Sequence, residues 1–176
     1  MPGWGNPLAS LQIWLDNPAE EADRRRKPQE SKQARLVDWL LRRNSISLQD
    51  VYVGYVLGCH VPKNVLKKKE PRIECLAACA QHRTPVANAK AIVALGEIAT
   101  LEFTGLSRVG DLAGAYRTML EPHRLRVYVN YAPGYALASP AEVVSISRSI
   151  WFAAEFCGLK PKINPTELQN FDFEIF

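Results

Sequence analysis

Residues 91–95 have the sequence AIVAL, an apolar run without a polar position, and a helical segment begins at Gly96 directly after it. A strand without polar alternation is buried on both faces, which is typical of a parallel sheet covered by helices on either side. Three other segments have strand character, namely LQIWLD at 11–16, VYVGYVL at 51–57 and VYVNY at 127–131. The chain is therefore expected to contain a parallel sheet.

Helical patterns separate these strands at 33–43, 72–82, 96–103 and 140–157, and the first of them places four apolar residues on one face: Leu36, Val37, Leu40 and Leu41. Strands that alternate with helices predict a three-layer α/β/α sandwich on a mainly parallel sheet of about four strands. Residues 20–32 are polar and charged throughout, and we expect an exposed loop there.

The last strand is followed by a loop, APGYALA, and then by a helix start. Ser139 is expected to cap the first turn of the helix, and Pro140 fits the first helical position. The Glu142 side chain can accept a hydrogen bond from the backbone N–H of Ser139. Open α/β folds bind ligands at the carboxyl ends of their strands. The loop, however, contains no acid, base, nucleophile or metal ligand.

The chain has 176 residues, of which 47% are hydrophobic and 23% are charged, as in one ordinary globular domain. The net charge of +4 permits binding to polyanions without requiring it. No apolar run reaches membrane-spanning length and the N-terminus has no apolar signal core, so we expect an intracellular, cytoplasmic protein without membrane contact. The four cysteines are too few for a disulfide scaffold.

Four motifs resemble, in order and spacing, the iron–sulfur branch (family 4) of the uracil-DNA glycosylase superfamily. That branch has G-x-G-N-P-x-A, V-Y-I-T-N-V-V-K-C-R-P-P-x-N, V-I-V-A-L-G and Y-H-P-S-x-L. The matching stretches here are GWGNPLA at 3–9, VYVGYVLGCHVPKN at 51–64, AIVALG at 91–96 and YAPGYAL at 131–137. The resemblance covers residues 3–158 and implies a uracil-DNA glycosylase-like fold. It also implies an enzyme that flips a damaged base into a pocket and cleaves its bond to the sugar.

In the family, the residue after the first strand acts on the water that attacks the sugar. The resemblance assigns this role to Asp16, at the position of the family's Glu, and to Asn17, at the position of an Asn in the mismatch-specific branch. The family's flanking glycines are missing here. The alternative is that either residue caps a turn before Pro18, as both residue types do well.

Other pocket positions of the family are altered. Gln29 stands for the aromatic residue that stacks on the base, Tyr55 for the Asn that reads the uracil edge, Ala132 for the His that stabilises the departing anion, and Gly134 for the Ser of the same motif. Loss of one electrostatic donor lowers a rate by about a hundred- to a thousandfold. The resemblance therefore implies a degenerate catalytic pocket.

The family's cluster uses four thiolates, and the first two precede the stretch at which this chain begins. Cys59 matches the third ligand, and Cys79, or less well Cys75, matches the fourth. We therefore expect no iron–sulfur cluster, no metal site and small buried cysteines instead. A zinc site of Cys59, His60, Cys75 and Cys79 has poor ligand spacing.

Two basic stretches follow strand ends in this interpretation. The first contains Arg24, Arg25, Arg26 and Lys27, and the second contains Lys63, Lys67, Lys68 and Lys69. Both could border one face and contact a phosphate backbone, or both could be solvated loops.

The C-terminus, NPTELQNFDFEIF, lies beyond the resemblance and contains Gln169, Phe171, Phe173 and Phe176. It resembles the short peptides that dock on bacterial sliding clamps and the tips of single-strand-binding proteins. Its alternation equally fits an added edge strand.

These observations predict a glycosylase-like domain at 1–160 and an extension at 161–176 that could bind a partner. The leading hypothesis is a catalytically degenerate uracil-DNA glycosylase-like protein that binds nucleic acid or takes part in replication or assembly. The alternatives are a divergent, active DNA glycosylase that uses Asp16 or Asn17, and a purely structural subunit that binds protein.

Overall fold

The computed structural model of the protein describes residues 2–119 and 125–162. A six-stranded sheet with the order β1-β3-β2-β4-β6-β5 runs through its centre. The strands are β1 (Trp4–Gly5), β2 (Leu11–Leu15), β3 (Val51–Tyr55), β4 (Ala91–Leu95), β5 (Tyr116–Met119) and β6 (Leu125–Asn130).

Four of these strands are parallel, namely β3, β2, β4 and β6, while β1 and β5 pair antiparallel at the two edges. The expected mainly parallel sheet is therefore confirmed, and AIVAL is its strand β4, buried at every position. The two edge strands were not expected from the sequence. β1 is only two residues long, and β5 has only four residues.

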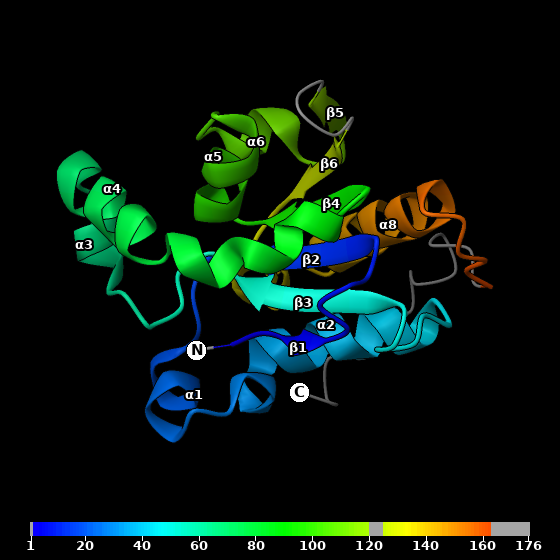
Figure 1. Ribbon diagram of the computed structural model, residues 1–176, viewed down its shortest axis with the longest axis horizontal. Coiled ribbons are helices and arrows are strands. Elements are labelled where there is room, and N and C mark those ends of the chain that lie inside the picture. Colours follow the sequence, from blue (N-terminus) through cyan, green and yellow to red (C-terminus); the bar gives the residue numbers. More distant parts are fainter. Residues whose placement is uncertain (1, 120–124, 163–176) are drawn as a thin grey trace.

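One face of the sheet is covered by α2 (Lys32–Arg43), α7 (Pro133–Ala136) and α8 (Pro140–Phe156), as Figure 1 shows for α2 and α8. The apolar residues expected on one face of α2 are all buried there, in a core that includes Leu11, Ile13 and Leu15 of β2. Ser31 caps α2, because its hydroxyl oxygen accepts a hydrogen bond from the Ala34 N–H at 3.1 Å.

The other face is covered by α4 (Lys69–Ala78), η2 (Ala80–Asn88), α5 (Glu97–Thr104) and α6 (Val109–Leu112). Here Trp14 and Ile92 pack with Ile98 of α5. Two helical layers around one sheet make the three-layer α/β/α sandwich that the sequence predicts.

Three expectations about local structure were wrong. Residues 20–32 are not only loop, since they form α1 (Glu20–Arg25) and the short 3-10 helix η1 (Pro28–Glu30). The basic stretch after β3 contains α3 (Lys63–Leu66), and the helix expected at 72–82 begins earlier and continues into η2. Ser139 makes no side-chain capping bond to α8, although Pro140 does occupy its first position.

In residues 2–119 and 125–162, no helix is both long and apolar enough to cross a membrane. From residue 163 onward the C-terminal extension, with Gln169, Phe171, Phe173 and Phe176, lies outside the described residues.

Candidate functional site

The carboxyl ends of the parallel strands carry the positions that the family resemblance assigns to a site. β2 ends at Leu15 and leads through Asp16 to α1, while β3 ends at Tyr55 and leads to α3 and α4. β6 ends at Asn130 and leads to α7. In Figure 1, α1, α3 and α4 lie together at the left, on the side to which the β3 arrow points. The loops that follow these strands therefore share one edge of the sheet.

Asp16 is bound to the start of α5. Its carboxylate accepts a hydrogen bond from the backbone N–H of Ala99 at 2.8 Å, at the N-terminal end of a helix. Gly96 precedes this helix with a φ of 117°, and a side chain there would collide with the Asp16 carboxylate. Asp16 thus caps α5, rather than a turn before Pro18.

Burial raises the pKa of Asp16 to about 7, although backbone hydrogen bonds from the first turn of α5 act in the opposite direction. The cause is desolvation, which disfavours the charged form of a carboxyl group. The carboxyl group can therefore exchange a proton near neutral pH, but its oxygens are directed at the helix.

Asn17 and its neighbours join the β2–α1 loop to the segment after β3. The Asn17 side chain donates to the carbonyl of Val61 at 3.3 Å, and the His60 N–H donates to Asp23 at 2.7 Å. The His60 ring nitrogen Nδ1 lies 3.1 Å from the carbonyl of Pro18. These contacts hold α1 beside the segment that leads to α3.

Tyr55 is a core residue, with 2% of its surface exposed. Its ring contacts Trp4 at a centroid distance of 5.9 Å, and its hydroxyl donates to the carbonyl of Pro28 at 3.3 Å. Burial raises the pKa of Tyr55 to about 12. The phenol therefore fills space beneath the loop of η1 and presents no polar edge to a ligand.

Two of the other altered positions, Gln29 and Gly134, line a hollow of about 740 Å³ between α1, η1 and α2. Its charged walls are Arg25, Lys32 and Arg35 together with Glu21 and Glu30, which both pair with Arg25. Lys32 and Arg35 form no ion pair with a described residue and leave a net positive charge, and we call this the basic hollow. Ala132 is the N-cap residue of α7 and makes no side-chain bond there. In the described structure Asp16, Asn17, Tyr55 and Ala132 do not line this hollow, so the carried-over positions do not converge on one cavity.

Ion pairs neutralise only part of the first basic stretch. Arg25 pairs with Glu21 at 2.7 Å and with Glu30 at 3.5 Å, and Lys27 pairs with Glu30 at 2.7 Å. Arg24 and Arg26 are exposed, and within the described residues neither forms an ion pair. In the second stretch Lys67, Lys68 and Lys69 are also exposed without an ion pair to a described residue, while Lys63 begins α3.

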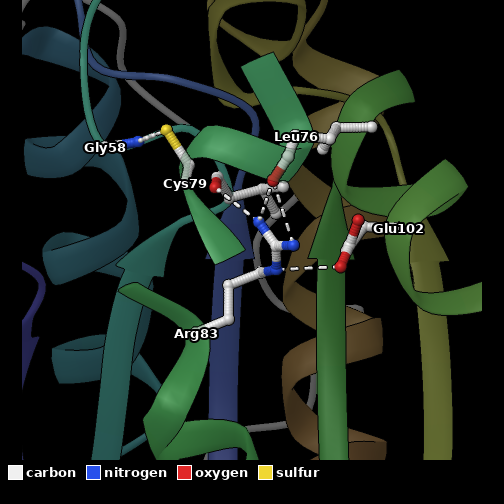
Figure 2. A network of polar contacts seen from close by, with 6 residues as sticks. Gly58, Leu76, Cys79, Arg83 and Glu102 are labelled. Carbon is white, nitrogen blue, oxygen red and sulfur yellow. Dashed lines mark hydrogen bonds and ion pairs between the residues drawn. The ribbon is translucent and has the colours of Figure 1, made fainter. Parts of the chain in front are cut away.

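A half-buried arginine holds the helical segment α4–η2 against the sheet. Arg83 in η2 pairs with Glu102 of α5 at 2.8 Å and donates to the carbonyls of Leu76 at 3.2 Å and Val56 at 3.3 Å. Figure 2 shows this network and, next to it, the hydrogen bond from the Gly58 N–H to the Cys79 sulfur. Arg83 therefore ties α4 and η2 to the end of β3.

The cysteines do not form a metal site among the described residues. Cys79 is buried, Cys75 is half-buried and Cys59 is exposed, and no three His, Cys, Asp or Glu side chains converge in this part of the chain. Desolvation raises the pKa of the Cys59 thiol, and nearby Cys79, Asp23 and Cys75 raise it further. The Cys59 thiol therefore favours its protonated form.

Sequence reasoning missed Lys32, Arg35 and Arg83. Lys32 and Arg35 lie three residues apart and face away from the apolar stripe of α2, so helical periodicity could have found them. Nothing in the sequence around Arg83 indicates its contacts, because its partners Val56 and Glu102 come from distant segments.

No family model matches the chain. A search of curated proteins finds the "Type-4 uracil-DNA glycosylase" of Archaeoglobus fulgidus, which is 26% identical over 171 residues. The aligned region covers 91% of this chain and 83% of the relative. Over most of its length the chain is therefore similar to a type-4 uracil-DNA glycosylase.

Proposed function

We propose that this protein is a catalytically degenerate uracil-DNA glycosylase-like protein that binds nucleic acid at the carboxyl edge of its sheet. The observation that carries the proposal is the basic hollow, where Gln29 and Gly134 stand among Arg25, Lys32 and Arg35. A phosphate backbone is attracted to such a surface through release of its counterions.

The structure around three of the carried-over positions supports the loss of base excision. The Asp16 carboxylate is occupied by the start of α5, and the Tyr55 ring is packed in the core. Ala132 has no group that can stabilise a departing anion. Each lost electrostatic contribution lowers a rate by about a hundred- to a thousandfold, so together they leave little excision.

DNA is the polyanion that best fits this surface. The relative is, by its name, a uracil-DNA glycosylase, and Arg24, Arg26 and Lys67 to Lys69 are exposed on the same edge. We extend the proposal to a cytoplasmic role in replication or assembly, with residues 161–176 as the segment that binds a protein partner. The glycosylase-like domain would then be residues 1–160 and would hold no iron–sulfur cluster.

The test combines binding and excision on one substrate. A fluorescent oligonucleotide with a single uracil should bind in single- and double-stranded form and should keep its base during prolonged incubation. An active family 4 glycosylase serves as the positive control. Excision that disappears in Asp16→Asn, from a preparation free of host glycosylase, would overturn the proposal.

A divergent glycosylase is the second candidate, and the neutral-range pKa of Asp16 favours it. A general base works best with a pKa near the working pH. For this candidate a panel of damaged bases should show one that is released with a pH profile that rises through about 7. The Asp16→Asn variant should lose that activity while its helix cap is retained.

A further inference from the structure

A second hollow, of about 670 Å³, lies between the edge strand β5 and helix α8, and we call it the α8 groove. In Figure 1 β5 is at the top and α8 is at the right, both away from α1, α3 and α4 at the left. Its volume is within the range of about 300–1,000 Å³ that is typical of small-molecule sites. The proposed function makes no use of this groove.

The helix side of the α8 groove changes in character along its length. Ser145, Arg148 and Ser149 line one end, and Phe152, Glu155 and Phe156 line the other. These residues recur at helical spacing, so they form a single stripe on α8. Phe152 is 52% exposed and Phe156 is 41% exposed, which leaves ring surface in contact with water.

The polar end offers hydrogen-bond donors. The Asn130 side chain donates to the hydroxyl oxygens of Ser145 and Ser149, at 3.0 Å in each case. Each hydroxyl therefore keeps its own hydrogen for a further bond. Ser149 is 3% exposed, so Ser145 is the more accessible of the two donors. Arg148 is exposed, and within the described residues it forms no ion pair. Two hydroxyl donors beside an unpaired guanidinium suit a phosphate group.

The aromatic end holds a fixed arginine. The Arg126 guanidinium lies 3.9 Å from the ring centroid of Phe156 and 4.5 Å from that of Tyr116. Its buried Nε atom has no hydrogen-bond partner among the described residues. Together with the nearby Glu155 carboxylate, this end offers flat rings, a guanidinium charge and an acceptor. A nucleobase has a flat ring with both acceptors and donors on its edge.

We propose that the α8 groove binds a nucleoside monophosphate unit, with its phosphate at Ser145, Arg148 and Ser149 and its base against Phe152 and Tyr116. The charge of Arg148 complements the phosphate. Exposed aromatic rings stack on bases of any identity. The unit comes either from a free nucleotide or from a single strand, and both present the same chemistry.

The test is calorimetric titration of the full chain with the four deoxynucleoside 5′-monophosphates, inorganic phosphate and a tetranucleotide. At least one monophosphate should bind, and inorganic phosphate should bind more weakly. Arg148→Ala and Phe152→Ala should each weaken nucleotide binding by about tenfold, which is within the range for one stacked base or one charged contact. Both residues are exposed on α8, and thermal melting checks that each variant is folded.

Lys32→Ala with Arg35→Ala tests the basic hollow as a competing phosphate site, and the control is Arg42→Ala with Arg43→Ala at the other end of α2, which should leave monophosphate binding unchanged. A tetranucleotide that binds more tightly than every monophosphate, and is weakened by Arg148→Ala, identifies a single strand as the source. Equal affinities for the tetranucleotide and the monophosphates identify a free nucleotide as the source of the bound unit.

This site would be refuted if no nucleotide bound at millimolar concentration. It would also be refuted if inorganic phosphate bound as tightly as the nucleotides. Loss of nucleotide binding in the basic-hollow variant but not in Arg148→Ala would place the nucleotide elsewhere. Binding of an acidic aromatic peptide, such as the NFDFEIF sequence, in place of the nucleotides would identify a protein partner and equally refute it. Each titration is repeated in the Lys32→Ala with Arg35→Ala variant, so that binding in the basic hollow is distinguished from binding in the α8 groove.

Discussion

The carboxylate of Asp16 and the backbone N–H of Ala99 lie 2.8 Å apart, and this hydrogen bond joins the end of strand β2 to the first turn of helix α5. The two residues are far apart in the sequence and meet because β2 and β4 are neighbours in the sheet. A side chain at the position of a catalytic residue in the family therefore has a structural partner here.

We predict that the stability of the protein depends on pH through Asp16. Its pKa is raised by burial from 3.8 to about 7, so the folded state prefers the protonated carboxyl group. The stability it contributes is fully present below the unfolded pKa and is lost as the pH rises toward 7. At 1.36 kcal/mol per unit the loss amounts to at most about 4 kcal/mol.

Asp16→Asn keeps an acceptor for Ala99 and cannot ionise. The stability of this variant relative to the wild type should therefore increase between pH 4 and pH 7, as measured by urea unfolding at each pH. A difference that stays constant over this range would show that the Asp16 pKa is not raised.

Tyr55 should behave as a core residue. Tyr55→Asn, which introduces the family's residue, should lower the free energy of unfolding by about 3 kcal/mol or more, because it empties a buried ring position. Tyr55→Phe removes only the hydrogen bond to Pro28 and should lower it by about 1 kcal/mol. The matched control is Tyr135→Asn on α7, where 56% of the side chain is exposed and the loss should stay below about 1 kcal/mol. Equal losses for Tyr55→Asn and Tyr135→Asn would contradict the core position of Tyr55.

Arg83→Ala should loosen α4 and η2. The variant leaves Glu102 half-buried without its partner and frees the carbonyls of Leu76 and Val56, so a loss of about 3 kcal/mol is expected. Amide exchange should become faster at 69–88 and stay unchanged in β4. The control, Arg108→Ala, removes a pair at 3.9 Å whose arginine side chain is 86% exposed, and it should change stability by less than about 0.5 kcal/mol. Similar stability losses for the two variants would show that the Arg83 network does not hold these helices.

The thiols should react in the order of their exposure. Cys59 is exposed and Cys79 is buried, so a maleimide should modify Cys59 first, and Cys59→Ser should remove the fast phase of the modification.

The protein purified without oxygen should be colourless and free of iron. Stoichiometric iron and sulfide, together with protection of Cys59 from the maleimide, would show that a cluster is bound after all.

The buried parallel strands were the part of the fold most accessible from sequence. AIVAL is apolar at every position, and the apolar stripe of α2 has helical spacing, so local pattern alone defines both. The edge strand β5 was missed because its pairing with β6 depends on tertiary contact rather than on alternation in its own short sequence. Ser139 was wrongly expected to cap α8 because the sequence of a capping box does not fix the side-chain geometry.

The candidate site was predictable only in its location. Strand order and the family resemblance place Asp16, Tyr55 and Ala132 at one edge of the sheet. The partner of Asp16 was not predictable, because Ala99 offers only a backbone N–H and no residue type marks it. The basic walls of the hollow were missed for a different reason, since Lys32 and Arg35 resemble any exposed pair on an amphipathic helix.

The salt dependence of DNA binding tests the central proposal most directly. Lys32→Ala with Arg35→Ala removes two positive charges at the hollow end of α2, and Arg42→Ala with Arg43→Ala removes two at its other end. The two ends are about 15 Å apart along the helix. Log affinity against log salt has a slope of about −0.9 per neutralised phosphate for duplex DNA and about −0.7 for a single strand.

We predict that the Lys32 and Arg35 variant, and separately a Lys67, Lys68 and Lys69 to alanine variant, bind more weakly with a slope that is shallower by about 1 to 2. The Arg42 and Arg43 variant should keep the slope of the wild type. Identical slopes in all three variants would show that DNA responds only to net charge, and would contradict a nucleic-acid site at the carboxyl edge of this sheet.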